Sequence, residues 1–109
     1  MSDGTTPAEL VWERPDGGRQ AFALEREMTL VGRGEEADVR IDEPLVSRLH
    51  ARLERRTGRY FVVDLGSTNL TRVNGDVVQE RELRDGDELL FSRARCQFRQ
   101  PPRAAAEPD

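Results

Sequence analysis

Apolar residues recur at every second position along much of the chain. This alternation predicts strands with one buried face, because successive side chains of a strand point to opposite sides. No long segment shows the 3.6-residue repeat of an amphipathic helix. The alternating sets are Leu10 and Trp12; Phe22 and Leu24; Val39 and Ile41; Leu49, Ala51 and Leu53; Leu89 and Phe91; and Ala94, Cys96 and Phe98.

Turn signals separate the expected strands: "PDGG" at 15–18, "TG" at 57–58, "NG" at 74–75 and "DG" at 85–86. These sequences suit hairpins, because glycine and asparagine tolerate a positive φ. Many short strands joined by such turns, with no helical connection, predict an all-β fold. The pattern favours an antiparallel β-sandwich or a barrel.

The two ends of the chain differ from its middle. Residues 1–7 and 100–109 are rich in small residues, proline and charge, and offer little to bury. We expect both segments to be disordered tails. The folded unit is then a single domain over residues 8–99, with Cys96 as a small core residue.

The amino-acid composition excludes several classes of function. The net charge of −4, with acidic and basic residues interleaved, argues against nucleic acid as a partner. All 17 basic residues are arginine, which can form forked contacts to oxyanions. One cysteine and one histidine leave no zinc set, and we expect no metal or cofactor. Without a long apolar run or a secretory signal, the sequence predicts a cytoplasmic protein that avoids membranes, and we expect a monomer.

Two chemical patterns invite an enzymatic interpretation. "GRGEEA" at 32–37 matches a dinucleotide fingerprint, but the following "ADVRID" alternates like a strand where the fingerprint needs a helix. Ser47, His50 and Asp64 have the residue types of a hydrolase triad, yet no Gly-x-Ser-x-Gly elbow is present. A lone histidine in a small β-domain is more often structural. We therefore expect no catalytic residue and no enzyme.

Several polar residues remain that neither core nor turn formation explains. Arg33 follows Gly32 at the end of an apolar run, Ser47 opens "SRLH", and "DLGSTN" at 64–69 leaves the run "YFVV". Loops on a rigid β scaffold can present such side chains together. A guanidinium fork with hydroxyl groups and backbone amides is chemistry suited to a phosphate.

These motifs resemble the forkhead-associated (FHA) domain family. The family pattern is Gly-Arg at a strand end, then Ser-x-x-His, then a segment close to Asp-x-x-Ser-x-Asn-Gly-Thr-x-Val-Asn-Gly, and later Asp-Gly-Asp. The chain has "GR" at 32–33, "SRLH" at 47–50, "DLGSTNLTRVNG" at 64–75 and "DGD" at 85–87. The resemblance covers residues 8–99 and implies a two-sheet sandwich of about eleven strands.

The resemblance also implies a function: binding a phosphothreonine in a partner protein or kinase, as an adaptor in bacterial serine/threonine-kinase signalling. The implied phosphate-binding residues are Arg33, Ser47, Arg48 and Thr68. Asn69 is expected to hold the main chain of the bound peptide. Structural support is expected from Gly32 and His50, which fix the loop of Ser47, and from Asn74 and Gly75, a hairpin turn in which Asn74 braces the recognition loop.

One position departs from the family pattern. Leu70 stands where the family usually has glycine, next to Asn69. If the backbone there needs a positive φ, leucine strains the loop by about 1–2 kcal/mol. This departure keeps open an alternative, a phosphate-independent interaction or assembly module with the same fold. A further hypothesis is that Thr5 or Thr6, once phosphorylated, docks into the same site.

Overall fold

The computed structural model describes residues 8–100, which form eleven strands and no helix. No segment of this part of the chain is therefore a helix that could span a membrane. The strands are β1 (Glu9–Glu13), β2 (Arg19–Ala23), β3 (Met28–Gly32), β4 (Val39–Arg40), β5 (Ala51–Arg56), β6 (Arg59–Asp64), β7 (Thr71–Val73), β8 (Asp76–Val77), β9 (Glu80–Leu83), β10 (Glu88–Phe91) and β11 (Ala94–Arg99).

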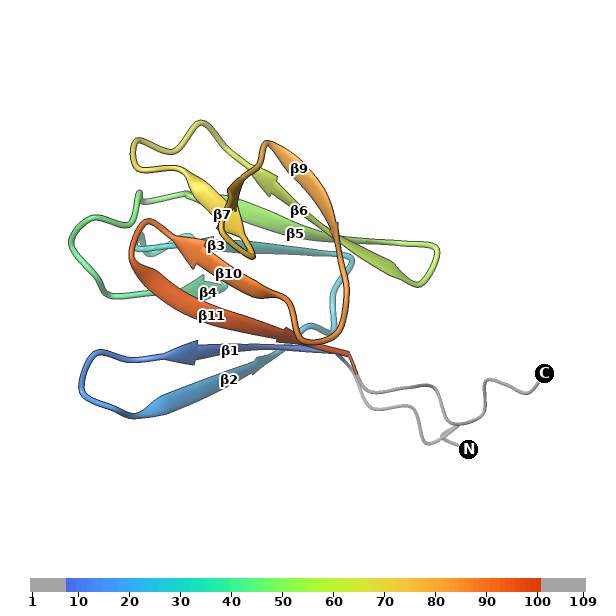
Figure 1. Cartoon of the computed structure of the whole chain (residues 1–109), viewed down its shortest axis with the longest axis horizontal. Helices are drawn as coiled ribbons and strands as arrows, with labels where there is room; N and C mark the ends of the chain where they lie inside the picture. The colour runs from blue at the N-terminus through green and yellow to red at the C-terminus, as the bar shows by residue number, and fades with distance from the viewer. Residues whose placement is uncertain (1–7, 101–109) are drawn as a thin grey trace.

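The strands form two sheets, and the expected all-β sandwich is confirmed. One sheet has six strands in the order β2-β1-β11-β10-β7-β8, and the other has five in the order β4-β3-β5-β6-β9. In Figure 1 the first sheet lies in front of β3 and β5. One pair departs from the antiparallel expectation, because β3 and β4 run parallel. The 33–38 loop returns the chain beside β3, where Asp38 exchanges hydrogen bonds of 2.8 Å with Leu30.

The core lies between the sheets and contains most of the alternating apolar residues. Cys96 is fully buried there, and burial raises the pKa of its thiol. Leu49 is the exception, because it precedes β5 and is 39% exposed. His50 takes the inward position instead, since its backbone N–H binds Val31 O at 2.8 Å and its ring is enclosed.

The four predicted turns are present. Those at 15–18, 57–58 and 74–75 close the hairpins β1–β2, β5–β6 and β7–β8. The turn at 85–86 is different, because it carries the chain from β9 in one sheet to β10 in the other. The hairpin expectation is therefore wrong for that turn.

The loops 33–38, 41–50, 65–70 and 92–93 gather at one end of the sandwich, on the left in Figure 1. The described chain begins and ends towards the other end. Gln100, expected in the tail, is held there by hydrogen bonds from its N–H to Asp85 Oδ1 at 2.8 Å and from Nε2 to Gly58 O at 3.4 Å. The hypotheses on Thr5, Thr6 and the disordered tails concern residues outside the described range.

Candidate phosphate-binding site

The end of β3 and the segment after Ser47 meet backbone to backbone. A Cβ on Gly32 would lie 2.0 Å from the carbonyl oxygen of Arg48, so only glycine fits. The N–H of Arg33 donates to Ser47 O and the N–H of Gly34 donates to Arg48 O, both at 3.0 Å. Gly32 thus allows the loop that carries Arg33 to lie directly against the loop that carries Ser47.

The Arg33 side chain is exposed and is anchored at one edge. Its Nε donates to Val46 O at 3.0 Å, immediately before Ser47. Within residues 8–100 no hydrogen bond or ion pair occupies its two Nη groups, so the outer edge of the guanidinium is available to an anion. The carbonyl oxygen of Arg33 in turn accepts from Nε of Arg40 at 3.1 Å.

A polar hollow of about 360 Å³ adjoins Arg33. Its lining residues are Arg33, Gly34, Glu35, Glu36, Arg40 and Arg48. Three guanidinium groups therefore share this hollow with two carboxylates, which moderate its positive potential. Arg48 is exposed and lines this hollow.

Two hydrogen bonds join the 41–50 and 65–70 loops. Ser47 Oγ accepts from the backbone N–H of Thr68 at 3.2 Å, and Asn69 Nδ2 donates to Leu45 O at 2.9 Å. Thr68 and Asn69 are exposed beside Ser47. The structure therefore brings Arg33, Ser47, Thr68 and Asn69 together from three separate loops.

His50 supports this junction from below. Its ring is buried and packs edge-on against Phe91, with ring centroids 5.6 Å apart. Nδ1 accepts from the N–H of Ser47 at 3.1 Å, so Nε2 carries the hydrogen and donates to Leu70 O at 2.8 Å. Burial lowers the pKa of His50, although the bond to Leu70 and the nearby Asp64 carboxylate favour the charged ring.

Asp64 organises the 65–70 loop, a role that the sequence analysis missed. Its carboxylate accepts from the N–H groups of Gly66 and Ser67, from Ser67 Oγ at 2.6 Å and from Thr71 Oγ1 at 2.7 Å. Partial burial raises the pKa of Asp64, but the hydrogen bonds from Ser67 and Thr71 outweigh it and hold the pKa below its ordinary value. The Asp-x-x-Ser spacing of an Asx turn was the available signal.

Leu70, which stands where the family usually has glycine, adopts a backbone conformation with positive φ. Its φ is 73°, in the left-handed region that disfavours a leucine side chain. The Leu70 carbonyl accepts from both His50 Nε2 and the N–H of Ser92, so two neighbours hold the strained backbone in place. The leucine side chain is 40% exposed and gains little burial in return.

Asn74 and Gly75 form the expected hairpin turn, with φ of 50° and 91°. Asn74 Nδ2 donates to Asp87 Oδ1 and Asn74 Oδ1 accepts from the N–H of Glu88, both at 3.0 Å. Among residues 8–100, no hydrogen bond joins the Asn74 side chain to the 65–70 loop. The Asn74 side chain thus stabilises the turn before β10 and not, as the family resemblance implied, the recognition loop. The reason is that β7 carries Asn74 away from that loop.

The enzymatic interpretations find no support in this geometry. His50 contacts the backbone N–H of Ser47, while the serine hydroxyl faces Thr68. The Asp64 carboxylate bonds to Gly66, Ser67 and Thr71, and no hydrogen bond links it to the His50 ring. After "GRGEEA" the chain enters β4, as expected, so no helix N-terminus faces that loop.

Comparison with known proteins identifies the protein family of this chain. The family profile of the FHA domain matches residues 29–92, which is more than half of the chain. The chain therefore belongs to the FHA domain family.

The chain is similar to regulators from actinobacteria. It is 40% identical to the oxoglutarate dehydrogenase inhibitor of Corynebacterium diphtheriae over 94% of this chain and 74% of that protein. It is 35% identical to the glycogen accumulation regulator GarA of Mycolicibacterium smegmatis, over 89% of this chain and 61% of GarA. Both relatives are thus longer than this chain.

Solved structures agree with the fold. A structure described as an analysis of phosphothreonine-dependent FHA domain interactions matches with a TM-score of 0.82 and 31% identity, over 89% of this chain and 99% of that one. The FhaA FHA domain, complexed with the intracellular domain of Rv3910, matches with a TM-score of 0.78 and 30% identity over 84% and 99%.

Proposed function

We propose that the loop end binds a phosphothreonine in a partner protein or kinase, and that the chain acts as an adaptor in bacterial serine/threonine-kinase signalling. The observation that carries this proposal is the junction of three loops around Arg33 and Ser47. Arg33 Nε is fixed to Val46 O, and Ser47 Oγ is fixed to the N–H of Thr68. These two hydrogen bonds end at the adjacent residues Val46 and Ser47, which supports the joint action of a guanidinium edge and a hydroxyl group on one anion.

The hydrogen-bonding capacity left on each side chain suggests how it would contact a phosphate. Because Ser47 Oγ already accepts a bond from Thr68, its own hydrogen remains to be donated to a phosphate oxygen. The free Nη groups of Arg33 supply charge-assisted bonds, and the Thr68 hydroxyl adds a neutral donor. Arg48 supplies a second cation at the rim of the polar hollow.

Asn69 is suited to hold the main chain of the peptide. Its Nδ2 is bound to Leu45 O, and this bond sets the orientation of the amide. Within the described residues no hydrogen bond uses its Oδ1, which is therefore free to accept an N–H from a bound peptide. Asn69 thus helps to position the peptide main chain, and Arg33 binds the charged phosphate.

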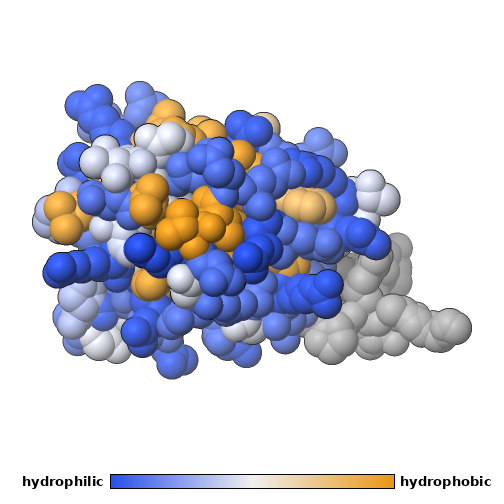
Figure 2. All heavy atoms as spheres, turned by 45° about the horizontal axis from the view of Figure 1, so that its top comes forward, coloured by the Kyte–Doolittle hydropathy of each residue, from blue (hydrophilic) through white to orange (hydrophobic). Residues whose placement is uncertain are grey.

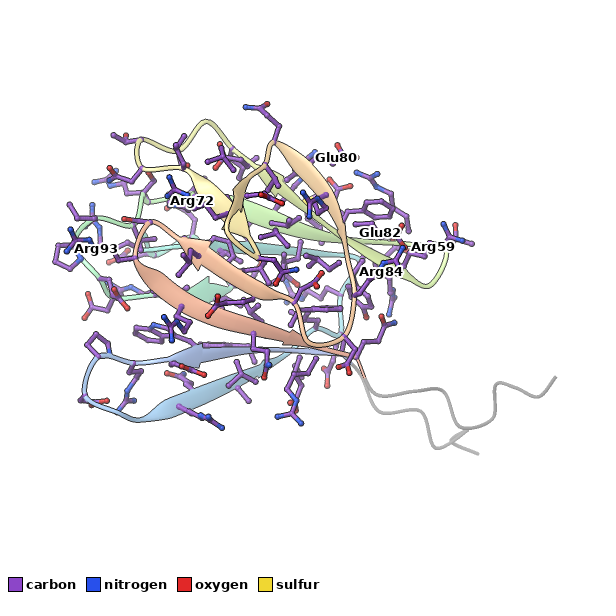
Figure 3. All side chains as sticks on the ribbon, viewed as in Figure 1. Arg59, Arg72, Glu80, Glu82, Arg84 and Arg93 are labelled. Atoms are coloured by element: carbon purple, nitrogen blue, oxygen red, sulfur yellow. The ribbon has the colours of Figure 1, made fainter. Side chains whose placement is uncertain are left out.

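Calorimetric titration of a phosphothreonine peptide library tests the proposal. We expect Arg33→Ala to remove about 1.5–3 kcal/mol of binding free energy, which is roughly a 10- to 150-fold loss of affinity. Arg84→Ala is the matched control, because Arg84 is exposed and lies towards the other end of the molecule (Figure 3). Equal affinity for the unphosphorylated peptides would contradict the proposal.

A second candidate function, phosphate-independent binding or assembly, is favoured by apolar side chains beside Asn69. Leu45 and Leu70 are 51% and 40% exposed, and a hollow of about 250 Å³ next to Leu45 is lined by Glu43, Pro44, Leu45, Val46, Ser92 and Arg93. Figure 3 shows Arg93 at this same end. A partner that stays bound after phosphatase treatment, and is released by Leu70→Ser, would support this candidate over the first.

A further inference from the structure

The sandwich has four sheet edges, and three of them are protected against pairing with another strand. An edge strand carries unpaired N–H and C=O groups, and proteins guard it with short length or charge. The edge strands β4 and β8 have two residues each. The edge strand β9 has the sequence EREL, with three charged residues out of four.

The fourth edge, β2 (Arg19–Ala23), lacks this protection. It has five residues, and "QAFA" at 20–23 carries no charge and no proline. All of β2 is exposed except Phe22, which is half-buried. Its pairing with β1 runs without interruption from Glu9↔Ala23 to Glu13↔Arg19, so no bulge twists the edge away. Figure 1 shows β2 along the lower border of the molecule, with no strand below it.

The hydrogen bonds to β1 show which backbone groups of β2 face outwards. Leu24 N–H donates to Ala8 O at 2.8 Å, and Gly18 O accepts from the N–H of Arg14 at 2.7 Å. Alternate residues of an antiparallel strand bond to the same neighbour. The even-numbered residues from 18 to 24 therefore face β1, and the odd-numbered residues from 19 to 25 direct N–H and C=O groups to the open side.

We propose that β2 pairs antiparallel with β2 of a second copy of this chain, centred on Phe22. In this register Ala21 lies opposite the partner's Ala23, and their outward groups exchange hydrogen bonds. Arg19 lies opposite the partner's Glu25, so the two-fold axis creates two pairs of opposite charge. Arg19 already lies 3.8 Å from Glu13 of its own chain. A register centred on Ala21 places Arg19 opposite an alanine and gives neither Arg19 nor Glu25 a charged partner across the dimer, which is why charge complementarity selects Phe22.

The surroundings of Phe22 fit this pairing. The two Phe22 residues occupy a position without ladder hydrogen bonds, where opposed Cα atoms approach to about 4.5 Å and side chains meet most closely. A hollow of about 430 Å³ lies beside Phe22, between β2 and the segments that carry Thr29 and Val39. This open side of the sandwich gives the aromatic pair room to pack, and pairing covers apolar surface that is half-exposed in one copy.

The dimer leaves the loop end free. Because paired strands run antiparallel, the two loop ends point in opposite directions along the joined sheet. The resulting particle presents two candidate phosphate sites, one at each end. The proposed dimer differs from the monomer that the sequence analysis expects.

Sedimentation of the full chain from micromolar to millimolar concentration tests the proposal. The mass is expected to rise from 12.4 kDa towards twice that value, and a mass of 12.4 kDa throughout overturns the proposal. Ala21→Pro removes one outward donor and none of the bonds to β1, so the chain is expected to keep its fold and stay monomeric. An unchanged dimer in a folded Ala21→Pro variant overturns it as well.

A charge exchange tests the register without proline. Arg19→Glu or Glu25→Arg alone places like charges opposite each other and is expected to weaken dimerisation about tenfold, whereas the double variant restores it. Arg84→Glu, away from β2, is the control and is expected to change nothing. Single variants that dimerise like the wild type, or a double variant that does not recover, overturn the proposed pairing.

Discussion

The loop end and the opposite end of the sandwich are built by different means. At the loop end, side chains reach across the chain: His50 binds Leu70 O, 20 residues away, and Ser47 binds Thr68 N–H, 21 residues away. At the opposite end, the turns at 57–58 and 85–86 rely on residues with positive φ. Hydrogen bonds from side chains to distant loops therefore fix the loop end, whereas the other end combines local turns with the hydrogen bonds of Gln100 to Asp85 and Gly58.

Substitutions at the two ends are therefore expected to affect stability and ligand binding differently. A substitution among the supporting side chains of the loop end removes a contact between two loops, and so affects both folding and ligand binding. A substitution at the opposite end affects a turn that no candidate ligand contacts. The surface between the ends is mainly hydrophilic, with small separated apolar groups on the face shown in Figure 2, so solvent-facing changes there make suitable controls.

The largest effect is expected from His50→Ala. The substitution leaves a cavity, removes the acceptor of Ser47 N–H and leaves Leu70 O with the N–H of Ser92 alone. We expect a loss of about 3–5 kcal/mol in the free energy of unfolding, with weaker phosphopeptide binding. Urea denaturation and calorimetry measure the two effects. Unchanged stability would show that the ring does not hold the loops together.

Asp64→Ala and Asn74→Ala form a matched pair. Asp64 accepts four hydrogen bonds within the loop end, and Asn74 makes two bonds to the turn before β10. We expect losses of about 2–3 kcal/mol for Asp64→Ala and about 1–2 kcal/mol for Asn74→Ala. Peptide affinity is expected to fall for the first variant only. Equal effects on affinity would erase the distinction between the two regions.

The stability of the free protein is expected to fall as the pH decreases below about 6.5. The folded state holds the pKa of His50 below its unfolded value, so the unfolded chain binds more protons in this range. Proton binding therefore stabilises the unfolded state relative to the folded state as the pH falls. One group contributes at most about 1.4 kcal/mol per pH unit. Thermal melting at a series of pH values measures this, and a flat profile between pH 7 and 5 would contradict it.

Phosphopeptide affinity is expected to fall below about pH 6 for a separate reason, because the phosphate then loses its second negative charge. A phosphonate peptide with a different second pKa shifts the midpoint of binding but leaves the melting profile of the free protein unchanged. A midpoint that does not follow the pKa of the ligand would argue against a doubly charged phosphate as the bound form.

The smallest effect is expected from Leu70→Gly. Relief of the left-handed strain stabilises the fold, and the added freedom of the unfolded chain offsets part of this gain, which leaves a net gain of about 0.5–1 kcal/mol. Asn74→Leu, which puts a leucine at another residue of positive φ and also removes the two Asn74 side-chain hydrogen bonds, is the opposite case and is expected to destabilise the protein. Denaturant titration of both variants measures the difference. A loss of stability in Leu70→Gly would mean that the leucine side chain contributes more packing than its exposure indicates.

The pattern of the sequence was a good guide to the strands and a weaker guide to the site. Alternation identified more than half of the core but missed residues such as Val31, Tyr60 and Val62. It also placed Leu49 inside, because a repeat does not reveal that the buried position belongs to His50. Resemblance to the FHA family located Arg33, Ser47, Thr68 and Asn69 at one end. It also predicted that Asn74 braces the recognition loop, whereas the Asn74 side chain forms its hydrogen bonds with Asp87 and Glu88.

What the sequence determined by itself was local: the alternation of strands, and the turns at glycine and asparagine, because these depend on neighbouring residues and on backbone sterics. The tertiary structure decided which polar groups share a site, how β4 runs beside β3, and which sheet edge is left open. Those outcomes depend on contacts between residues far apart in the chain. The junction of Ser47 with Thr68 exists only once both sheets have formed and brought their loops to the same end.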